Sequence, residues 1–194
     1  MKVKEFFEIL LPQKMPDYEF RKAQVEMADL VREVFEFGGK ALIEAGTGTG
    51  KSLAYLVPAL LTNDKSHVAI STGTKNLQEQ LYKKDLPYLH KIWGKDFSYM
   101  LIQGRGNYLC MTRLMTTLIN EQERSDLKKW ASVTASGNLN DLTGKFDWNT
   151  LRSVAADPDY CLGQKCLRRN ACFLTKLRLE AENCKILVVN HHLL

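Results

Sequence analysis

One short stretch of the sequence has residue types suited to holding phosphate groups. It runs Ala45-Gly46-Thr47-Gly48-Thr49-Gly50-Lys51-Ser52. Its glycines let backbone N–H groups approach an anion closely, because no Cβ atoms stand in the way. Lys51 can reach the β- and γ-phosphates of a nucleotide, and the Ser52 hydroxyl can ligate Mg²⁺. We therefore predict a nucleotide-binding loop in which Lys51 and Ser52 act on the phosphates.

The residues on either side of this loop favour a binding site over a plain turn. Residues 41–43 are an apolar run that predicts a strand, and the apolar residues after Lys51 recur at helical spacing. A glycine-rich turn alone is often only a connection between a strand and a helix. The order strand, turn, Lys-Ser and helix is far more specific. Ala45 stands where the motif usually begins with glycine, and a small residue suffices there.

An amphipathic helix is predicted upstream of the loop, between Arg21 and Phe35, and it ends at Gly38-Gly39. Gln24 lies in its first turns. A glutamine amide offers a donor and an acceptor together, so Gln24 can read an adenine edge. The alternative is an ordinary solvated helix residue.

A second group of polar residues follows the predicted strand at residues 67–71. The group is Thr72, Thr74, Asn76 and Gln78, at the start of a predicted helix. Ligands of α/β sheets bind at the carboxyl ends of strands, so these hydroxyls and amides are candidates for phosphodiester contacts. Ordinary capping of the helix is the alternative.

Four cysteines form the candidate metal site: Cys110, Cys161, Cys166 and Cys172. Four thiolates suit tetrahedral zinc or an iron–sulfur cluster, and the spacing does not separate the two. The alternative is four buried free cysteines. Cys184 stands apart from the others and is predicted to be a packing residue.

The elements that position these residues predict an α/β fold with an insertion. Further strands are predicted at residues 97–102 and 185–190, whereas residues 111–172 carry only helical signals. We therefore expect an α/β domain formed by residues 1–104 and 173–194, interrupted by a subdomain at 105–172. Basic and aromatic residues alternate in that insertion, which suits single-stranded nucleic acid.

Composition narrows the class of protein. The 194 residues carry a net charge of +5, which is compatible with a polyanionic partner but does not establish one. No window is long and apolar enough to span a membrane or to serve as a secretion signal. We expect a cytoplasmic protein with no membrane partner, in which five cysteines are poor disulfide candidates.

Taken together, these motifs resemble the DinG/XPD group of superfamily 2 DNA helicases. The matching segments, in order, are Arg21-x-x-Gln24-x-x-Met27, the phosphate loop from Glu44 to Ser52, the stretch from Ser71 to Leu81, Gly104 to Cys110, Asp157 to Cys161, and Val188 to Leu194. In that group they are the adenine-reading motif, motifs I and Ia, the two edges of an iron–sulfur domain, and the segment before an Asp-Glu-x-His box.

The resemblance implies a RecA-like P-loop domain with a parallel sheet and an inserted, mainly helical iron–sulfur subdomain. It implies ATP and Mg²⁺ on the phosphate loop, with Arg21 and Gln24 at the adenine, and a [4Fe-4S] cluster on the four cysteines. It also implies a monomer in DNA repair that hydrolyses ATP to move 5′ to 3′ on single-stranded or forked DNA, with Thr72, Thr74, Asn76 and Gln78 contacting the strand.

Two parts of the family pattern are missing from the sequence: the Asp-Glu-x-His box and the second RecA-like domain. We therefore expect the N-terminal part of a helicase, with an incomplete sheet, that binds ATP and single-stranded DNA but cannot unwind DNA and hydrolyses ATP barely if at all. Two alternatives stay open. One is a non-catalytic module that binds nucleotide and nucleic acid, and the other is a P-loop ATPase or nuclease with a zinc clip.

Overall fold

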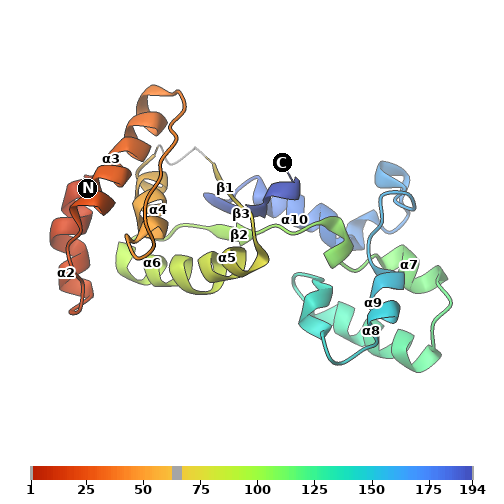
Figure 1. The fold of residues 1–194 in the computed structure, drawn as a ribbon. Coiled ribbons are helices and arrows are strands. Elements are labelled where there is room, and N and C mark those ends of the chain that lie inside the picture. The colour runs from red at the N-terminus through yellow and green to blue at the C-terminus, as the bar shows by residue number, and fades with distance from the viewer. Residues whose placement is uncertain (1, 63–66, 194) are drawn as a thin grey trace. The chain divides into compact units, whose positions relative to one another are not determined.

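The computed structural model describes residues 2–62 and 67–193, which form two compact units (Figure 1). The first unit comprises Met1–Leu101 with Asn183–His191, and the second comprises Ile102–Glu182 with His192–Leu194. The second unit is thus an insertion into the first in terms of the sequence. It includes helix α10 (Phe173–Ala181), which we expected to lie in the α/β domain.

A small parallel sheet lies in the first unit. Its strands are β1 (Val68–Thr72), β2 (Tyr99–Leu101) and β3 (Ile186–Asn190), and their order is β1-β3-β2. Residue Ile186 is in register with Val68 on one side and with Tyr99 on the other. Ile186 and Val188 of the central strand are fully buried, as expected for a strand with neighbours on both sides. The three strands confirm the predictions for residues 67–71, 97–102 and 185–190.

Helical segments form the rest of the first unit. They are α1 (Val3–Glu5), the π-helical segment η1 (Phe6–Leu10), α2 (Leu11–Lys14), α3 (Lys22–Phe37), α4 (Lys51–Leu61), α5 (Lys75–Gln80), the π-helical segment η2 (Leu81–Asp85) and α6 (Leu86–Trp93). Helix α3 packs on α4 through Val25 and Ala28, and Leu56 of α4 is fully buried in the same core as β3. Burial of this shared core holds α4, which follows the phosphate loop, against both α3 and the sheet.

The strand predicted for residues 41–43 is not formed. Residues 38–46 have no regular secondary structure, and Leu42 is fully exposed. A strand is stable only when a neighbour pairs with its backbone N–H and C=O groups. The three described strands pair only with one another, so this apolar run has no strand partner.

The second unit is mainly helical. Its longer helices are α7 (Met111–Thr116), α8 (Glu121–Val133), α9 (Trp148–Val154) and α10, with short 3₁₀ turns η3 (Arg105–Asn107), η4 (Leu139–Leu142), η5 (Gly163–Lys165), η6 (Arg169–Ala171) and η7 (His191–Leu193) between or after them. Leu114 and Leu127 from α7 and α8 pack with Leu151 of α9 in a core of their own. The unit therefore has an independent apolar core, which suits an insertion.

No helix within the described residues is both long enough and apolar enough to cross a bilayer. Helix α3, with 16 residues, is shorter than a typical span of roughly 20 residues, and it carries charged side chains along its length.

Gly137 and Phe173 fix the join between the middle of the second unit and α10. Gly137 has a φ of +62°, and a Cβ atom there would lie 2.2 Å from Cγ of Phe173. Phe173 is 4% exposed and belongs to the apolar core of the unit. Only glycine therefore permits both the left-handed backbone and the close contact with the ring.

We expect Gly137→Ala to destabilise the chain more than Gly144→Ala does. Gly144 has a similar φ of +82° but nothing within 4 Å of its Cβ position. Alanine is strained by the left-handed backbone at both positions, and only at position 137 does its Cβ also collide with the Phe173 ring. The difference in free energy of unfolding should be about 1–3 kcal/mol, measured by urea denaturation. Equal losses in the two variants would contradict the importance of the contact with Phe173.

Candidate functional site

The phosphate loop leads directly into helix α4, which begins at Lys51. Gly48 and Gly50 have φ values of +80° and +78°, in the left-handed region that glycine adopts readily. Gly46, the first glycine of the loop, does not have a positive φ. Gly50 is the N-cap residue of α4, so its carbonyl accepts the first helical hydrogen bond, from Ala54 N at 3.2 Å.

The loop is closed by hydrogen bonds to its own carbonyl groups. The Lys51 ammonium donates to the carbonyl oxygens of Ala45 at 2.8 Å and Gly46 at 2.7 Å. The Thr49 hydroxyl donates to the Gly46 carbonyl at 2.9 Å. A triphosphate that binds here must therefore compete with two backbone carbonyls for the Lys51 ammonium.

Gln24 contacts the loop from inside the protein. It is 2% exposed, and its Nε2 donates to the Gly50 carbonyl at 2.9 Å. Its Oε1 accepts a hydrogen bond from the Tyr18 hydroxyl at 3.1 Å. Burial raises the pKa of Tyr18, which keeps the proton that this bond requires on the hydroxyl at neutral pH. Arg21, the other residue predicted at the adenine, lies at the N-terminus of α3 and pairs with exposed Glu19 at 3.4 Å.

Ser52 lies in the first turn of α4 and hydrogen-bonds with Tyr55, one turn further along. Burial is the main cause that raises the pKa of Tyr55, and the nearby Asp85 carboxylate adds to it. Together Lys51 and Ser52 place one cation and one hydroxyl at the head of the same helix.

The residues predicted to contact nucleic acid fall into two environments. Thr72 and Gln78 are each 2% exposed, and the Thr72 hydroxyl donates to the carbonyl oxygens of Thr74 at 3.2 Å and Val189 at 3.4 Å. The Thr74 hydroxyl caps α5 by accepting from Leu77 N at 3.2 Å, and Asn76 is exposed. Thr74 therefore caps the helix, which was the alternative to a contact with nucleic acid. The exposed side chains of this segment include Asn76.

All four predicted cysteine ligands line one cavity of about 310 Å³ in the second unit. Five arginines line it as well: Arg105, Arg113, Arg168, Arg169 and Arg178. Within the described ranges, no three His, Cys, Asp or Glu side chains lie in an arrangement that could hold a metal ion. Cys184 is 4% exposed in the first unit, as expected for a packing residue.

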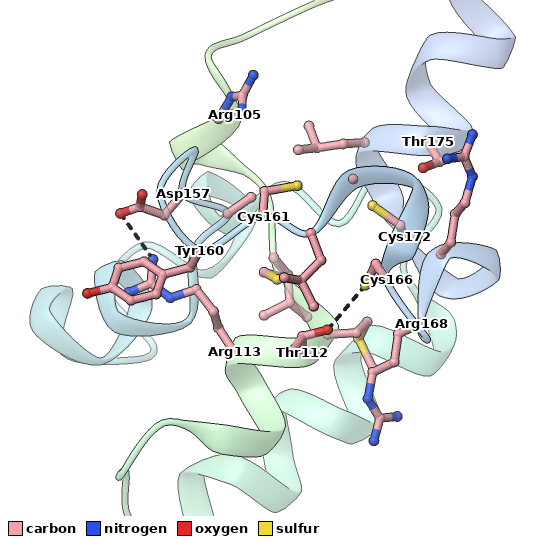
Figure 2. Close-up of a pocket in the computed structure, with 18 of the residues that line it drawn as sticks. Arg105, Thr112, Arg113, Asp157, Tyr160, Cys161, Cys166, Arg168, Cys172 and Thr175 are labelled. Carbon is pink, nitrogen blue, oxygen red and sulfur yellow. Dashed lines mark hydrogen bonds and ion pairs between the residues drawn. The ribbon is translucent and has the colours of Figure 1, made fainter.

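Hydrogen bonds lower the pKa of one of these cysteines. The Thr112 hydroxyl lies 3.5 Å from Sγ of Cys166, as Figure 2 shows. This contact is the main cause that lowers the pKa of the Cys166 thiol, and the backbone N–H and positive charge of Arg168 lower it further. Thiolate is the form that binds metals.

Arg113 lines the same cavity and contacts several of its neighbours. Its guanidinium forms an ion pair with Asp157 at 3.4 Å and donates to the Ala155 carbonyl at 2.9 Å. It also lies over the Tyr160 ring, at 5.1 Å from the centroid. Figure 2 shows Arg113, Asp157 and Tyr160 together at one side of the cavity, so this arginine fixes the segment that precedes Cys161.

Three residues near these sites were not predicted from the sequence: Tyr18, Lys75 and Thr112. Tyr18 lies six positions before Gln24 in an extended segment, where no periodicity links the two. Lys75 is exposed beside Asn76. Its positive charge was the feature of the sequence that could have indicated a contact with phosphate. Thr112 follows Cys110 by two residues, and a hydroxyl so near a cysteine is a weak hint by itself.

Comparison with known proteins gives consistent matches. Residues 22–138 match the DEAD/DEAH box helicase family. The chain is 38% identical over 192 residues to the ATP-dependent DNA helicase YoaA of Escherichia coli (strain K12), which covers 94% of the chain and 30% of that protein. It is 35% identical over 202 residues to the ATP-dependent helicase DinG of Mycobacterium tuberculosis (strain ATCC 25177 / H37Ra), which covers 90% of the chain and 30% of that protein. The chain therefore spans about 30% of the length of these curated relatives.

We expect Lys51→Ala to weaken nucleotide binding by about tenfold or more, because a charge-assisted hydrogen bond contributes roughly 1.5–3 kcal/mol. The measurement is titration with a fluorescent ATP analogue. Lys22→Ala is the control, since that ammonium pairs with Glu26 at 3.2 Å on the exposed side of α3. If both variants bind as tightly as the wild type, the loop does not hold phosphate.

Proposed function

Since the chain belongs to the DEAD/DEAH box helicase family, we propose that it is the nucleotide-binding part of an ATP-dependent DNA helicase of the DinG type. The observation that carries this proposal is the phosphate loop at the head of α4, with Lys51 and Ser52 in the first helical turn. In this role the loop amides and Lys51 hold the phosphates of ATP, and the Ser52 hydroxyl ligates Mg²⁺. Arg21, exposed at the start of α3, is the residue we propose for the adenine side.

Binding and turnover of ATP should be separate properties of this chain. Phosphoryl transfer also needs an acidic residue to fix the metal, a group to orient water and usually an arginine at the γ-phosphate. The sequence has no Asp-Glu-x-His box. We propose that these residues bind ATP, and that rapid hydrolysis and 5′ to 3′ movement on DNA require parts that the longer relatives carry.

We propose that single-stranded DNA binds along the exposed start of α5. Lys75 and Asn76 offer a cation and an amide to phosphates, and Thr74 lies beside them. Thr72 and Gln78 support this surface from inside, since their side chains are buried. Contacts of this kind are tolerant of sequence, which suits an enzyme that moves along a strand.

The four predicted cysteine ligands line one cavity of the second unit, with Cys110 just before α7 and the other three within residues 161–172. Four thiolates suit an iron–sulfur cluster or a single zinc ion. The resemblance of the neighbouring motifs to the DinG/XPD group favours the cluster. We propose that Cys110, Cys161, Cys166 and Cys172 hold a [4Fe-4S] cluster, which supplies a structural clip. The surrounding arginines would offset the negative charge of such a group.

Anaerobic purification should yield about four irons per chain and broad visible absorption. Cys161→Ser should lower the iron content sharply, because it removes one of the proposed ligands. Cys184→Ser, in the first unit, is the matched control and should leave the iron content unchanged. Stoichiometric zinc without iron would rule out the cluster.

Binding of an oligothymidylate strand should weaken steeply as salt concentration rises, because lysines and arginines release counterions from the phosphates. Lys75→Ala should weaken binding and reduce the salt slope by about 0.7, the value for one phosphate contact on a single strand. Lys83→Ala removes the same charge from an ammonium already paired with Glu79 at 2.8 Å, and it should have little effect. Equal effects of the two variants would argue against a contact at α5.

A further inference from the structure

The segment that carries three of the four cysteines is not fixed by apolar burial. Residues 154–156 are buried, but every residue from 157 to 172 is exposed or only half-buried. Two leucines of this segment, Leu162 and Leu167, are exposed. Packing of apolar side chains is what fixes most segments of a folded chain. The position of these three cysteines relative to Cys110 therefore depends on polar contacts.

Backbone hydrogen bonds join the two ligand segments only in part. Cys110 N donates to the Val154 carbonyl at 2.9 Å. Ala156 N donates to the Tyr108 carbonyl at 2.8 Å. The chain up to the first cysteine is thus held beside the buried residues that precede the exposed segment. Both bonds lie before Cys161 in the sequence, so they do not by themselves place that thiol.

Arg113 extends the link beyond these two bonds. Its guanidinium donates to the Ala155 carbonyl at 2.9 Å. It also forms an ion pair with Asp157 at 3.4 Å, as Figure 2 shows. The other oxygen of Asp157 accepts a hydrogen bond from Asp159 N at 2.9 Å, within the turn that leads to Cys161. One carboxylate therefore connects the guanidinium to this turn.

We propose that Arg113 and Asp157 are positioning residues for the iron–sulfur cluster, which hold Cys161 in a fixed place relative to Cys110. The inference rests on the proposed cluster. Arg113 lies in the first turn of α7, which Cys110 precedes. Asp157 lies at the turn before Cys161, so the contact between the two side chains joins two ligand segments. These side chains are 21% and 35% exposed, and water screens a partly buried ion pair less than one at the surface.

Arg113→Met removes the ion pair, the hydrogen bond and the contact with the Tyr160 ring together, and it keeps an unbranched side chain. The anaerobically purified chain should then lose iron to a chelator about tenfold faster, because removing a partner outside the ligand shell weakens metal binding by this much or more. The decay of the visible absorption measures the rate. Arg113→Lys keeps the charge beside Asp157 and should lose iron at a rate between those of Arg113→Met and the wild type.

Asp157→Asn is the milder variant. Its amide oxygen can still accept from Asp159 N, so it removes only the negative charge that pairs with Arg113. We expect about threefold faster loss of iron, because the pair is partly exposed. If the two residues act as one pair, adding Asp157→Asn to Arg113→Met should accelerate the loss no further. Effects that add in full would contradict the pairing.

Arg124→Met is the matched control for a purely structural role. The Arg124 guanidinium donates to the carbonyl oxygens of Leu114 and, at 2.8 Å, of Thr117, so it joins α8 to the end of α7. It does not line the cysteine cavity. This variant should lower the free energy of unfolding in urea without accelerating the loss of iron. If Arg113 only stabilised the second unit, both variants would accelerate the loss in proportion to their loss of stability.

The same measurements separate these positioning roles from the cluster itself. If the wild type contains no iron, the proposed cluster is wrong and the inference fails with it. If the wild type holds about four irons and the Arg113 and Asp157 variants release them at the wild-type rate, only the inference fails. Circular dichroism shows whether each variant is folded, and if Arg113→Met is not, Asp157→Asn and Arg113→Lys decide.

Discussion

The first unit depends on the close approach of the Gln24 amide to the Gly50 carbonyl. This contact requires glycine, because a side chain at position 50 would collide with the amide. It joins α3 to the head of α4, and the packing of Val25 and Ala28 on α4 brings the two helices close enough for it to form. Apolar burial thus supplies the free energy, and the buried polar contact determines the register in which the two helices meet.

The sheet is completed by a segment from far along the chain. Strand β3 follows Ile102–Glu182 of the second unit in the sequence and lies between β1 and β2. Its backbone satisfies the hydrogen-bonding groups of both neighbours, so the first unit cannot form its sheet until residues 186–190 return to it. The insertion is therefore tied at both ends to the strands of one sheet, and its own apolar core lets it fold around its own contacts.

The second unit combines a packed core with a cavity that thiols, arginines and apolar side chains line. Leucines from α7, α8 and α9 form the core, whereas the cavity collects thiols and guanidinium groups. Four of the five arginines at the cavity are exposed, so water screens most of their charge, and Arg113 is half-buried. Arg113 has partners in Asp157 and the Tyr160 ring. The excess of positive charge around the thiols is the feature of this unit that packing alone does not explain.

The sequence by itself determined the parts of this protein that depend on local pattern. Glycine positions, apolar periodicity and short spacings were enough to predict the glycine-rich loop before α4, the three strands and the longer helices, because each is encoded within about 20 residues. Tertiary structure decided which polar side chains face inward. Gln24, Thr72 and Gln78 are buried because other elements pack against their side chains. Residues 41–43 form no strand because no neighbouring strand pairs with them. Which four cysteines share a cavity was suggested by spacing, but the arginines around them come from segments up to 73 positions apart, from Arg105 to Arg178, and only folding brings them together.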